Sequence, residues 1–267
     1  MLSGMPSEPP MELRDVAADL GVHYQTAYRW VRTGRLPAVM VSGKYLVSRA
    51  DLADFARLRT SPKAVPAPGS RRLDGQAERM YDALCAGDDP TARRMARRLV
   101  EEGTSVKELI AQVLAPPLSR IGQSWHEGKT SIWVEHRASA IVDRILGELT
   151  PTPRGRRRGT VVVAAVAGDL HVLPTAMAAA VLREDNWHVE HLGANMPPDE
   201  LVSFCAAHDV SVVVLSVTNS DVADVAQRAA ANIRKAAIPV VVGGAGGSLD
   251  DLIDDVRAAV SLARPPR

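Results

Sequence analysis

The chain has 267 residues, and its 32 basic and 31 acidic side chains give a formal net charge of +1. This length exceeds that of most single folding units and predicts two or three domains. Two cysteines are too few for a disulfide framework. No apolar run approaches the roughly 20 residues that span a bilayer, so we expect a cytoplasmic protein without a membrane segment.

The near-neutral total hides a gradient of charge along the chain. Residues 1–75 carry 11 basic and 7 acidic side chains, whereas residues 160–267 carry 7 and 13. Between Asp19 and Asp51 there is no acidic residue, and five Arg or Lys side chains fall in that interval. The N-terminal part is therefore predicted to present a local basic surface of the kind that contacts nucleic acid.

The N-terminal 60 residues have the spacing of a helix-turn-helix. Leu13–Leu20 and Tyr24–Arg32 read as two short helices around Gly21, and the strands Val39–Val41 and Tyr45–Val47 read as a hairpin wing. Polar side chains of the second helix and the wing are of types that read base edges or hold phosphates. We expect the DNA contacts to come from Gln25, Thr26, Arg29, Arg32, Arg35 and Lys44.

The string ELRDVAADLGVHYQTAYRWVRTGRLPAVMVSGKYLVSRADLADF resembles the excisionase-like, MerR-related winged helix-turn-helix family. The resemblance covers most of residues 11–56. It implies that residues 1–60 bind double-stranded operator DNA. Helix-turn-helix spacing alone also occurs in helical proteins that bind no DNA.

Residues 61–73 contain prolines, a glycine and basic side chains without apolar periodicity, which predicts an extended linker. Residues 74–150 then show apolar spacings of three and four, and Ser105 with Glu108 forms a capping-box pattern. This pattern predicts a four-helix bundle. Its helices are expected at Glu78–Ala86, Pro90–Glu102, Ser105–Leu114 and Ser131–Leu149.

Residues 160–267 alternate between β-branched runs and helical segments, which predicts a Rossmann-like parallel sheet. The fold class is thus multidomain, α and α/β. Ligands of such sheets lie outside the carboxyl ends of the strands. We therefore expect Gly168–Leu173, Ser216–Asn219 and Gly243–Gly247 to converge there.

The turn after the first strand of this sheet lacks the Gly-x-Gly-x-x-Gly that a dinucleotide pyrophosphate requires. It offers His171 instead, two residues after Asp169. A neutral imidazole oriented by a carboxylate can ligate a metal, and a single protein ligand suits a metal whose other positions belong to a macrocycle. An ordinary loop histidine is the alternative interpretation.

Asp169-Leu170-His171 resembles the cobalamin-binding domain family, together with later residues at the strand ends. The resemblance implies that His171 is the lower axial cobalt ligand, that Asp169 supports it, and that the nucleotide tail lies along Ser216, Thr218, Gly243 and Gly244. The family pattern is Asp-x-His-x-x-Gly. Pro174 takes the place of the last glycine, which puts the base-off, His-on binding mode in doubt.

In the middle domain, Trp125 precedes Glu135-His136 by nine intervening residues. This spacing resembles the adenosylcobalamin-dependent light-responsive regulators of the CarH/LitR type. The resemblance implies that the bundle covers the upper corrin face, where Trp125 packs at the adenosyl group and Glu135 and His136 contact it or a neighbouring subunit. His126 could approach the cobalt once the alkyl group has left.

Taken together, these patterns predict a transcriptional regulator rather than an enzyme. The resemblance implies that adenosylcobalamin and its photolysis control a homo-oligomer, dimer or tetramer, and its binding to DNA. One alternative is a corrinoid carrier of a methyltransferase or mutase system. Another is a regulator of the same fold that senses a different tetrapyrrole or no cofactor.

Overall fold

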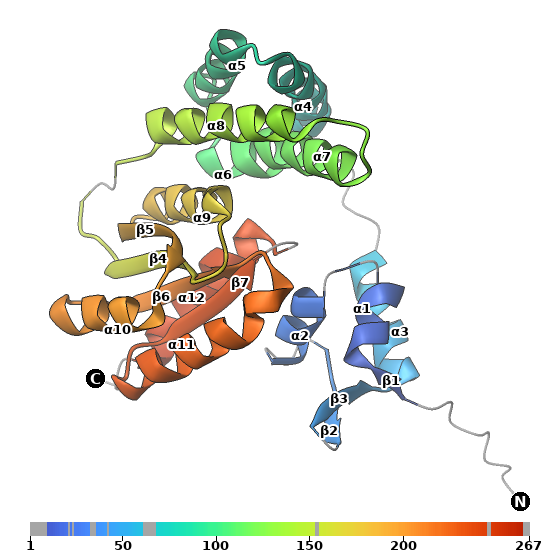
Figure 1. Cartoon of the computed structure of the whole chain (residues 1–267), viewed down its shortest axis with the longest axis vertical. Coiled ribbons are helices and arrows are strands. Elements are labelled where there is room, and N and C mark those ends of the chain that lie inside the picture. Colours follow the sequence, from blue (N-terminus) through green and yellow to red (C-terminus); the bar gives the residue numbers. More distant parts are fainter. Residues whose placement is uncertain are drawn as a thin grey trace, which may run out of the picture. The chain divides into compact units, whose positions relative to one another are not determined.

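A computed structural model describes residues 10–20, 22, 24–32, 36–41, 43–60, 68–152, 155–244 and 247–263. The chain divides into two compact units (Figure 1). The smaller consists mainly of residues 1–65, and the larger covers residues 66–242 and 248–267. None of the helices described is long and apolar enough to cross a membrane.

The smaller unit is a winged helix-turn-helix, as predicted. Its elements are β1 (Met11–Glu12), α1 (Leu13–Asp19), α2 (Tyr24–Arg32), β2 (Val39–Val41), β3 (Lys44–Val47) and α3 (Arg49–Thr60). The three strands are antiparallel in the order β1-β3-β2. Val16, Ala27, Trp30 and Phe55 are buried together, so α1, α2 and α3 share one core with the wing.

The larger unit begins with a helical bundle. Its elements are α4 (Pro68–Ala86), α5 (Asp89–Glu101), α6 (Val106–Leu109), the π turn η1 (Ile110–Leu114), α7 (Ala115–His126) and α8 (Ile132–Leu149). Asp88 accepts a hydrogen bond from Thr91 N at the start of α5, and Ser105 and Glu108 form the predicted capping box. Helices α5 and α6 therefore start where a side chain satisfies one of their first N–H groups.

Two predictions for this part need correction. The linker expected over residues 61–73 is too long, because residues 68–73 are already helical in α4 and Leu73 is buried in the bundle core. The helix α7 was not predicted. Pro116 and Pro117 open it, and proline is tolerated there because the first N–H groups of a helix have no partner inside the helix.

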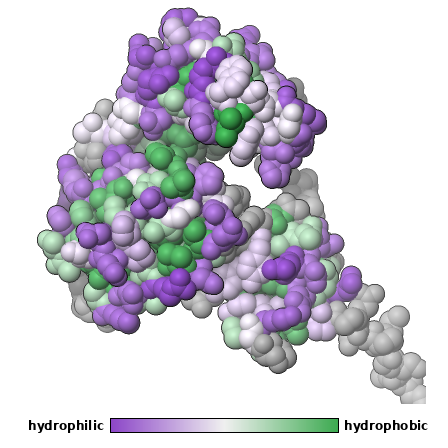
Figure 2. All heavy atoms as spheres, viewed as in Figure 1, coloured by the Kyte–Doolittle hydropathy of each residue, from purple (hydrophilic) through white to green (hydrophobic). Residues whose placement is uncertain are grey.

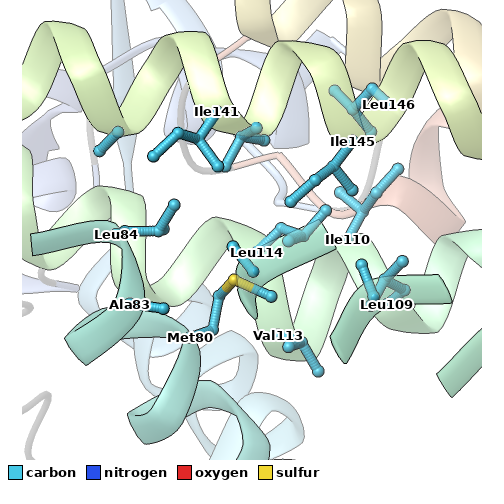
Figure 3. Packing of buried hydrophobic residues seen from close by; sticks show 14 of the residues in the cluster. Met80, Ala83, Leu84, Leu109, Ile110, Val113, Leu114, Ile141, Ile145 and Leu146 are labelled. Atoms are coloured by element: carbon cyan, nitrogen blue, oxygen red, sulfur yellow. The ribbon is translucent and has the colours of Figure 1, made fainter. Parts of the chain in front are cut away.

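The bundle core is aliphatic and close-packed. Figure 3 shows Ile141 and Ile145 of α8 pointing toward residues of α4 and of the α6–η1 segment, among them Met80 and Leu114. The visible outer face of the bundle is mostly hydrophilic (Figure 2). Apolar residues that recur with the 3.6-residue period of a helix thus form one buried stripe on each helix of the bundle.

The second part of the larger unit is the predicted parallel sheet. Its elements are β4 (Thr160–Val166), α9 (Val172–Glu184), β5 (His188–Met196), α10 (Pro198–Ala207), β6 (Val212–Val217), the 3₁₀ turn η2 (Ser220–Val222), α11 (Ala223–Lys235), β7 (Val240–Gly244) and α12 (Leu249–Ala263). The strand order is β5-β4-β6-β7. Val161 and Val163 pack against α9 and α12, whereas Val162 packs against α10 and α11, as the two-residue period of a strand requires.

Helix α9 joins the sheet to the bundle. Ala180 and Val181 of α9 belong to the bundle core. At the end of α9 the Glu184 carboxylate accepts hydrogen bonds from Val106 N at 2.7 Å and Lys107 N at 2.9 Å. The bundle and the sheet therefore form one compact unit. The domain boundary expected between them, at residues 150–160, stays a prediction.

Candidate functional site

The turn between β4 and α9 carries Asp169 and His171. Asp169 is fully buried, whereas the His171 side chain is 56% exposed. Asp169 Oδ1 accepts from His171 Nδ1 at 2.7 Å and from His171 N at 3.1 Å. His171 is also the residue that caps α9, so its backbone position is set by the start of that helix.

The other oxygen of Asp169 joins this turn to the end of β6. Asp169 Oδ2 accepts from Thr218 N at 2.6 Å and from Asn219 N at 3.3 Å. Burial raises the pKa of Asp169, but the N–H groups of Thr218 and His171 outweigh it and hold that pKa below its usual value. These hydrogen bonds bring together two of the three segments expected to converge, and Gly243 and Gly244 end β7, the strand beside β6.

The Asp169 carboxylate also fixes the chemistry of the imidazole. An ionised carboxylate can only accept, so His171 Nδ1 carries the proton and Nε2 keeps its lone pair. A carboxylate on the other ring nitrogen is the usual support for a metal-ligating histidine. The exposed Nε2 of His171 is therefore equipped to hold a metal ion from one side.

The surroundings of this turn fit a large cofactor with an apolar face and a polar tail. Leu170 and Val172, on either side of His171, are 72% and 47% exposed. The buried hydroxyl of Thr218 has no hydrogen-bond partner among the described residues, and Ser216 beside it is buried. A buried hydroxyl without a partner is costly unless a ligand completes it.

Pro174, the departure from the family pattern, lies in the first turn of α9. The N–H groups of a first helical turn have no partner within the helix, so proline removes no intrahelical hydrogen bond at this position. The local fold of the turn therefore tolerates Pro174.

Two further residues of this site were not singled out from the sequence. Gly168 has a φ of +90°, and a Cβ there would lie 2.8 Å from Val222 Cγ1. Asn195, at the end of β5, also has a positive φ, of 56°. Asn195 Oδ1 accepts from Gly168 N at 2.9 Å, and Asn195 N donates to the Asp169 carbonyl oxygen at 2.9 Å.

The bundle carries the other predicted cofactor contacts. Trp125 and His126, both exposed, end α7, and Glu135 and His136 lie near the start of α8. Glu135 accepts from His136 Nδ1 at 2.7 Å and from Ser139 Oγ at 2.8 Å. Both oxygens of Glu135 are thus engaged within α8. In Figure 1 the start of α8 and the end of β4 lie on the same side of the larger unit.

The DNA-reading residues were expected on α2 and the wing. The backbone of α2 is helical over Gln25, Thr26, Arg29 and Arg32, but their side chains lie outside what the structure describes, and so does all of Arg35. Lys44 is exposed at the start of β3, and its Nζ lies 2.7 Å from Glu12 Oε1. On the inward-facing side of α2, Ala27 and Trp30 are buried.

Three family models match this chain. Residues 11–59 match a helix-turn-helix domain, residues 76–150 match a B12 binding domain, and residues 159–255 match a second type of B12 binding domain. The HTH-type transcriptional repressor CarH of Myxococcus xanthus is 32% identical over 174 residues, which are 63% of this chain and 57% of that protein. Over these regions the chain is similar to B12 binding domains, to a helix-turn-helix domain and to the repressor CarH.

One more curated protein is similar in sequence, and one solved structure is similar in fold. The HTH-type transcriptional repressor CarA of Myxococcus xanthus is 27% identical over 247 residues, 72% of this chain and 82% of that protein. The structure of the Methanosarcina barkeri monomethylamine corrinoid protein is 15% identical, with a TM-score of 0.55 over 71% of this chain and 97% of that one. The chain matches 57% of the length of CarH.

Proposed function

We propose that this chain is a light-responsive transcriptional regulator whose oligomerisation and DNA binding follow the state of a bound adenosylcobalamin. The observation that carries the proposal is the Asp169–His171 pair, which leaves an exposed imidazole Nε2 at the carboxyl end of β4. The same chain carries a winged helix-turn-helix. A cofactor site and a DNA-binding unit in one chain suit a regulator.

Each part of the larger unit would hold a different part of the cofactor. His171 would hold the cobalt, with Asp169 fixing its ring, and the nucleotide tail would lie along Ser216, Thr218, Gly243 and Gly244. The residues proposed to contact the upper axial group are Trp125, His126, Glu135 and His136. Adenosylcobalamin would supply a cobalt–carbon bond that light breaks.

Helix α9 offers a route from the cofactor to the bundle. It begins at the His171 cap and ends at Glu184, whose carboxylate holds the first N–H groups of α6. A shift of His171 would therefore be carried along one rigid helix to the bundle. If the bundle contributes to a dimer or tetramer, that shift changes how many winged helices one assembly presents, and linked DNA-binding modules gain about 10²–10⁴ in affinity over single ones.

The cofactor proposal is tested by absorption spectroscopy. The purified chain is loaded with adenosylcobalamin in the dark, freed of unbound cofactor and illuminated with green light. We expect the corrinoid to co-elute, and its spectrum to change on illumination together with the oligomeric state. His171→Ala should lose the His-ligated spectrum, whereas His208→Ala, an exposed histidine at the end of α10, should not. A chain that retains no corrinoid refutes the proposal.

The DNA proposal is tested with duplexes that the wild-type chain selects from a random-sequence pool. Arg29→Ala and Arg32→Ala should weaken binding to these duplexes at matched salt. Unchanged binding by both variants would overturn the assignment of α2 as the recognition helix. The helix-turn-helix match favours this function over a corrinoid carrier, and a carrier would leave the selection without enriched duplexes.

A further inference from the structure

The turn that carries His171 is held from the neighbouring strand β5 at both of its ends. At the first end, Asn195 makes a two-point contact: Oδ1 accepts from Gly168 N and its own N donates to the carbonyl oxygen of Asp169, each at 2.9 Å. These contacts fix the backbone on both sides of the bond between Gly168 and Asp169.

The second end is fixed by a side-chain relay. Thr175, fully buried in the first turns of α9, donates its hydroxyl to the Val172 carbonyl oxygen at 2.7 Å. Because that proton is used, the Thr175 oxygen accepts from His191 Nε2 of β5 at 2.8 Å. Strand β5 therefore contacts this end of the turn through His191 and the other end through Asn195.

The contact at Asn195 is specific in two ways. Its backbone has a φ of +56°, a left-handed conformation that Asn and Gly tolerate better than most residues. Its side chain supplies the acceptor for Gly168 N, which lies two residues after the end of β4. The register of β4 and β5 also shifts twice before Val166 pairs with Met196, which places Asn195 opposite the turn.

We propose that Asn195 is a positioning residue for His171. By holding the Asp169 backbone it fixes the point from which the buried carboxylate reaches His171 Nδ1, and so the direction of Nε2. The identity of the ligand of His171 rests on the proposed function, whereas the contacts of Asn195 do not depend on it. Removal of Asn195 should leave the sheet folded and lower the fraction of corrinoid bound through His171.

Three variants separate the side chain from the backbone. Asn195→Asp keeps an acceptor at the same position, Asn195→Gly keeps the left-handed backbone without an acceptor, and Asn195→Ala keeps neither. Asn186→Gly is the matched control, because Asn186 also has a positive φ, of 68°, and precedes β5 at the opposite edge of the sheet.

The first measurement is the affinity and spectrum of the corrinoid complex. Loss of a residue that orients a metal ligand typically costs 10–100-fold in affinity, and Asn195 acts one step further away. We expect Asn195→Gly to bind roughly tenfold more weakly with a reduced His-ligated spectrum. Asn195→Asp and Asn186→Gly should stay close to wild type. Wild-type affinity and spectrum in a folded Asn195→Gly would overturn the proposal.

The second measurement needs no cofactor. Two-bond ¹H–¹⁵N NMR correlations report which ring nitrogen of His171 carries the proton, and we expect Nδ1–H in the wild type and a mixture in Asn195→Gly. If no variant and no wild-type protein retains corrinoid, the proposed function fails, while the tautomer of His171 still decides the role of Asn195. An unchanged tautomer in Asn195→Gly contradicts that role.

Discussion

Asp169 Oδ2 accepts the N–H of Thr218 at 2.6 Å, which joins two strand ends that lie 49 residues apart in the sequence. The same carboxylate reaches His171 Nδ1 with its other oxygen. One buried side chain therefore holds both the segment after β4 and the segment after β6.

The first prediction concerns this carboxylate. In Asp169→Asn one acceptor oxygen becomes an NH₂ group that faces N–H donors, so the hydrogen bonds to Thr218 N or to His171 are lost. We expect the affinity for cobalamin to fall by roughly 10–100-fold. Titration with cobalamin, followed by absorption, measures this effect. Asp199→Asn, in the exposed first turn of α10, is the control, and equal affinities of the two variants would contradict the role of Asp169.

The second prediction concerns acid stability. The pKa of Asp169 is held below its usual value, so the ionised form is favoured in the folded chain. Its contribution to the free energy of unfolding is fully present above the unfolded pKa of about 3.9 and is lost as the pH falls through the lowered folded pKa. Urea unfolding of wild type and Asp169→Asn should differ by a constant amount from about pH 5 to 7. That difference should shrink below about pH 4, and a pH-independent difference would contradict it.

The third prediction uses two glycines with similar backbones. Gly168 and Gly193 both have positive φ, of 90° and 76°, but an added Cβ meets Val222 Cγ1 only at Gly168 and nothing within 4 Å at Gly193. Alanine should cost about 1–3 kcal/mol of stability at either site because of backbone strain. Gly168→Ala should cost about 1–3 kcal/mol more because of overpacking.

Urea unfolding of the two variants measures this difference. A double-mutant cycle with Val222→Ala should recover much of the additional cost at Gly168, since the contact is then removed. Equal losses of the free energy of unfolding in Gly168→Ala and Gly193→Ala would show that the contact with Val222 does not destabilise Gly168→Ala.

The fourth prediction concerns the contact between α9 and α6. Glu184 accepts from Val106 N and Lys107 N, as an N-terminal cap supplied by another helix. Glu184→Ala should lower the free energy of unfolding by about 1 kcal/mol and speed amide hydrogen exchange at both N–H groups. Glu101→Ala, an exposed residue at the end of α5, is the control. Unchanged exchange in Glu184→Ala would rule out the cap.

The fifth prediction concerns Lys44 at the wing. Its ion pair with Glu12 is exposed on both sides, so Lys44→Ala should change stability by less than about 1 kcal/mol. If Lys44 contacts a phosphate, the slope of log binding constant against log salt concentration should become shallower by about 1. A salt slope equal to that of the wild type would exclude a phosphate contact by Lys44.

The sequence was most informative where one pattern dominates. The buried run Thr160–Val166 has the aliphatic character of a parallel strand covered on both faces, and it is β4. Asp169 and His171 could be proposed as candidate site residues because the end of such a strand is where ligands bind. The helices α7 and α12 were not predicted, and Pro116 with Pro117 hides the start of α7 behind residues that usually end a helix.

Asn195 could not be recognised from the sequence for a different reason. Its role depends on a left-handed backbone and on a contact with Gly168, 27 residues away, that exists only once β4 and β5 have paired. An asparagine near the end of a strand otherwise reads as an ordinary turn residue. A residue that would position a candidate ligand is thus less visible in the sequence than the candidate ligand itself.

The π turn η1 has a consequence for the direction in which Trp125 and His126 point. It lies between α6 and α7, with Ile110, Val113 and Leu114 buried, and a π turn contains one residue more than the α-helical turn it replaces. Each residue of an α-helix turns the chain by about 100°. Deletion of a single residue here would rotate Trp125 and His126 away from their present direction, although neither of these residues is itself changed. The direction in which the side chains of α7 point therefore depends on the number of residues in η1. A scan of single substitutions, which keeps that number constant, would not reveal this dependence.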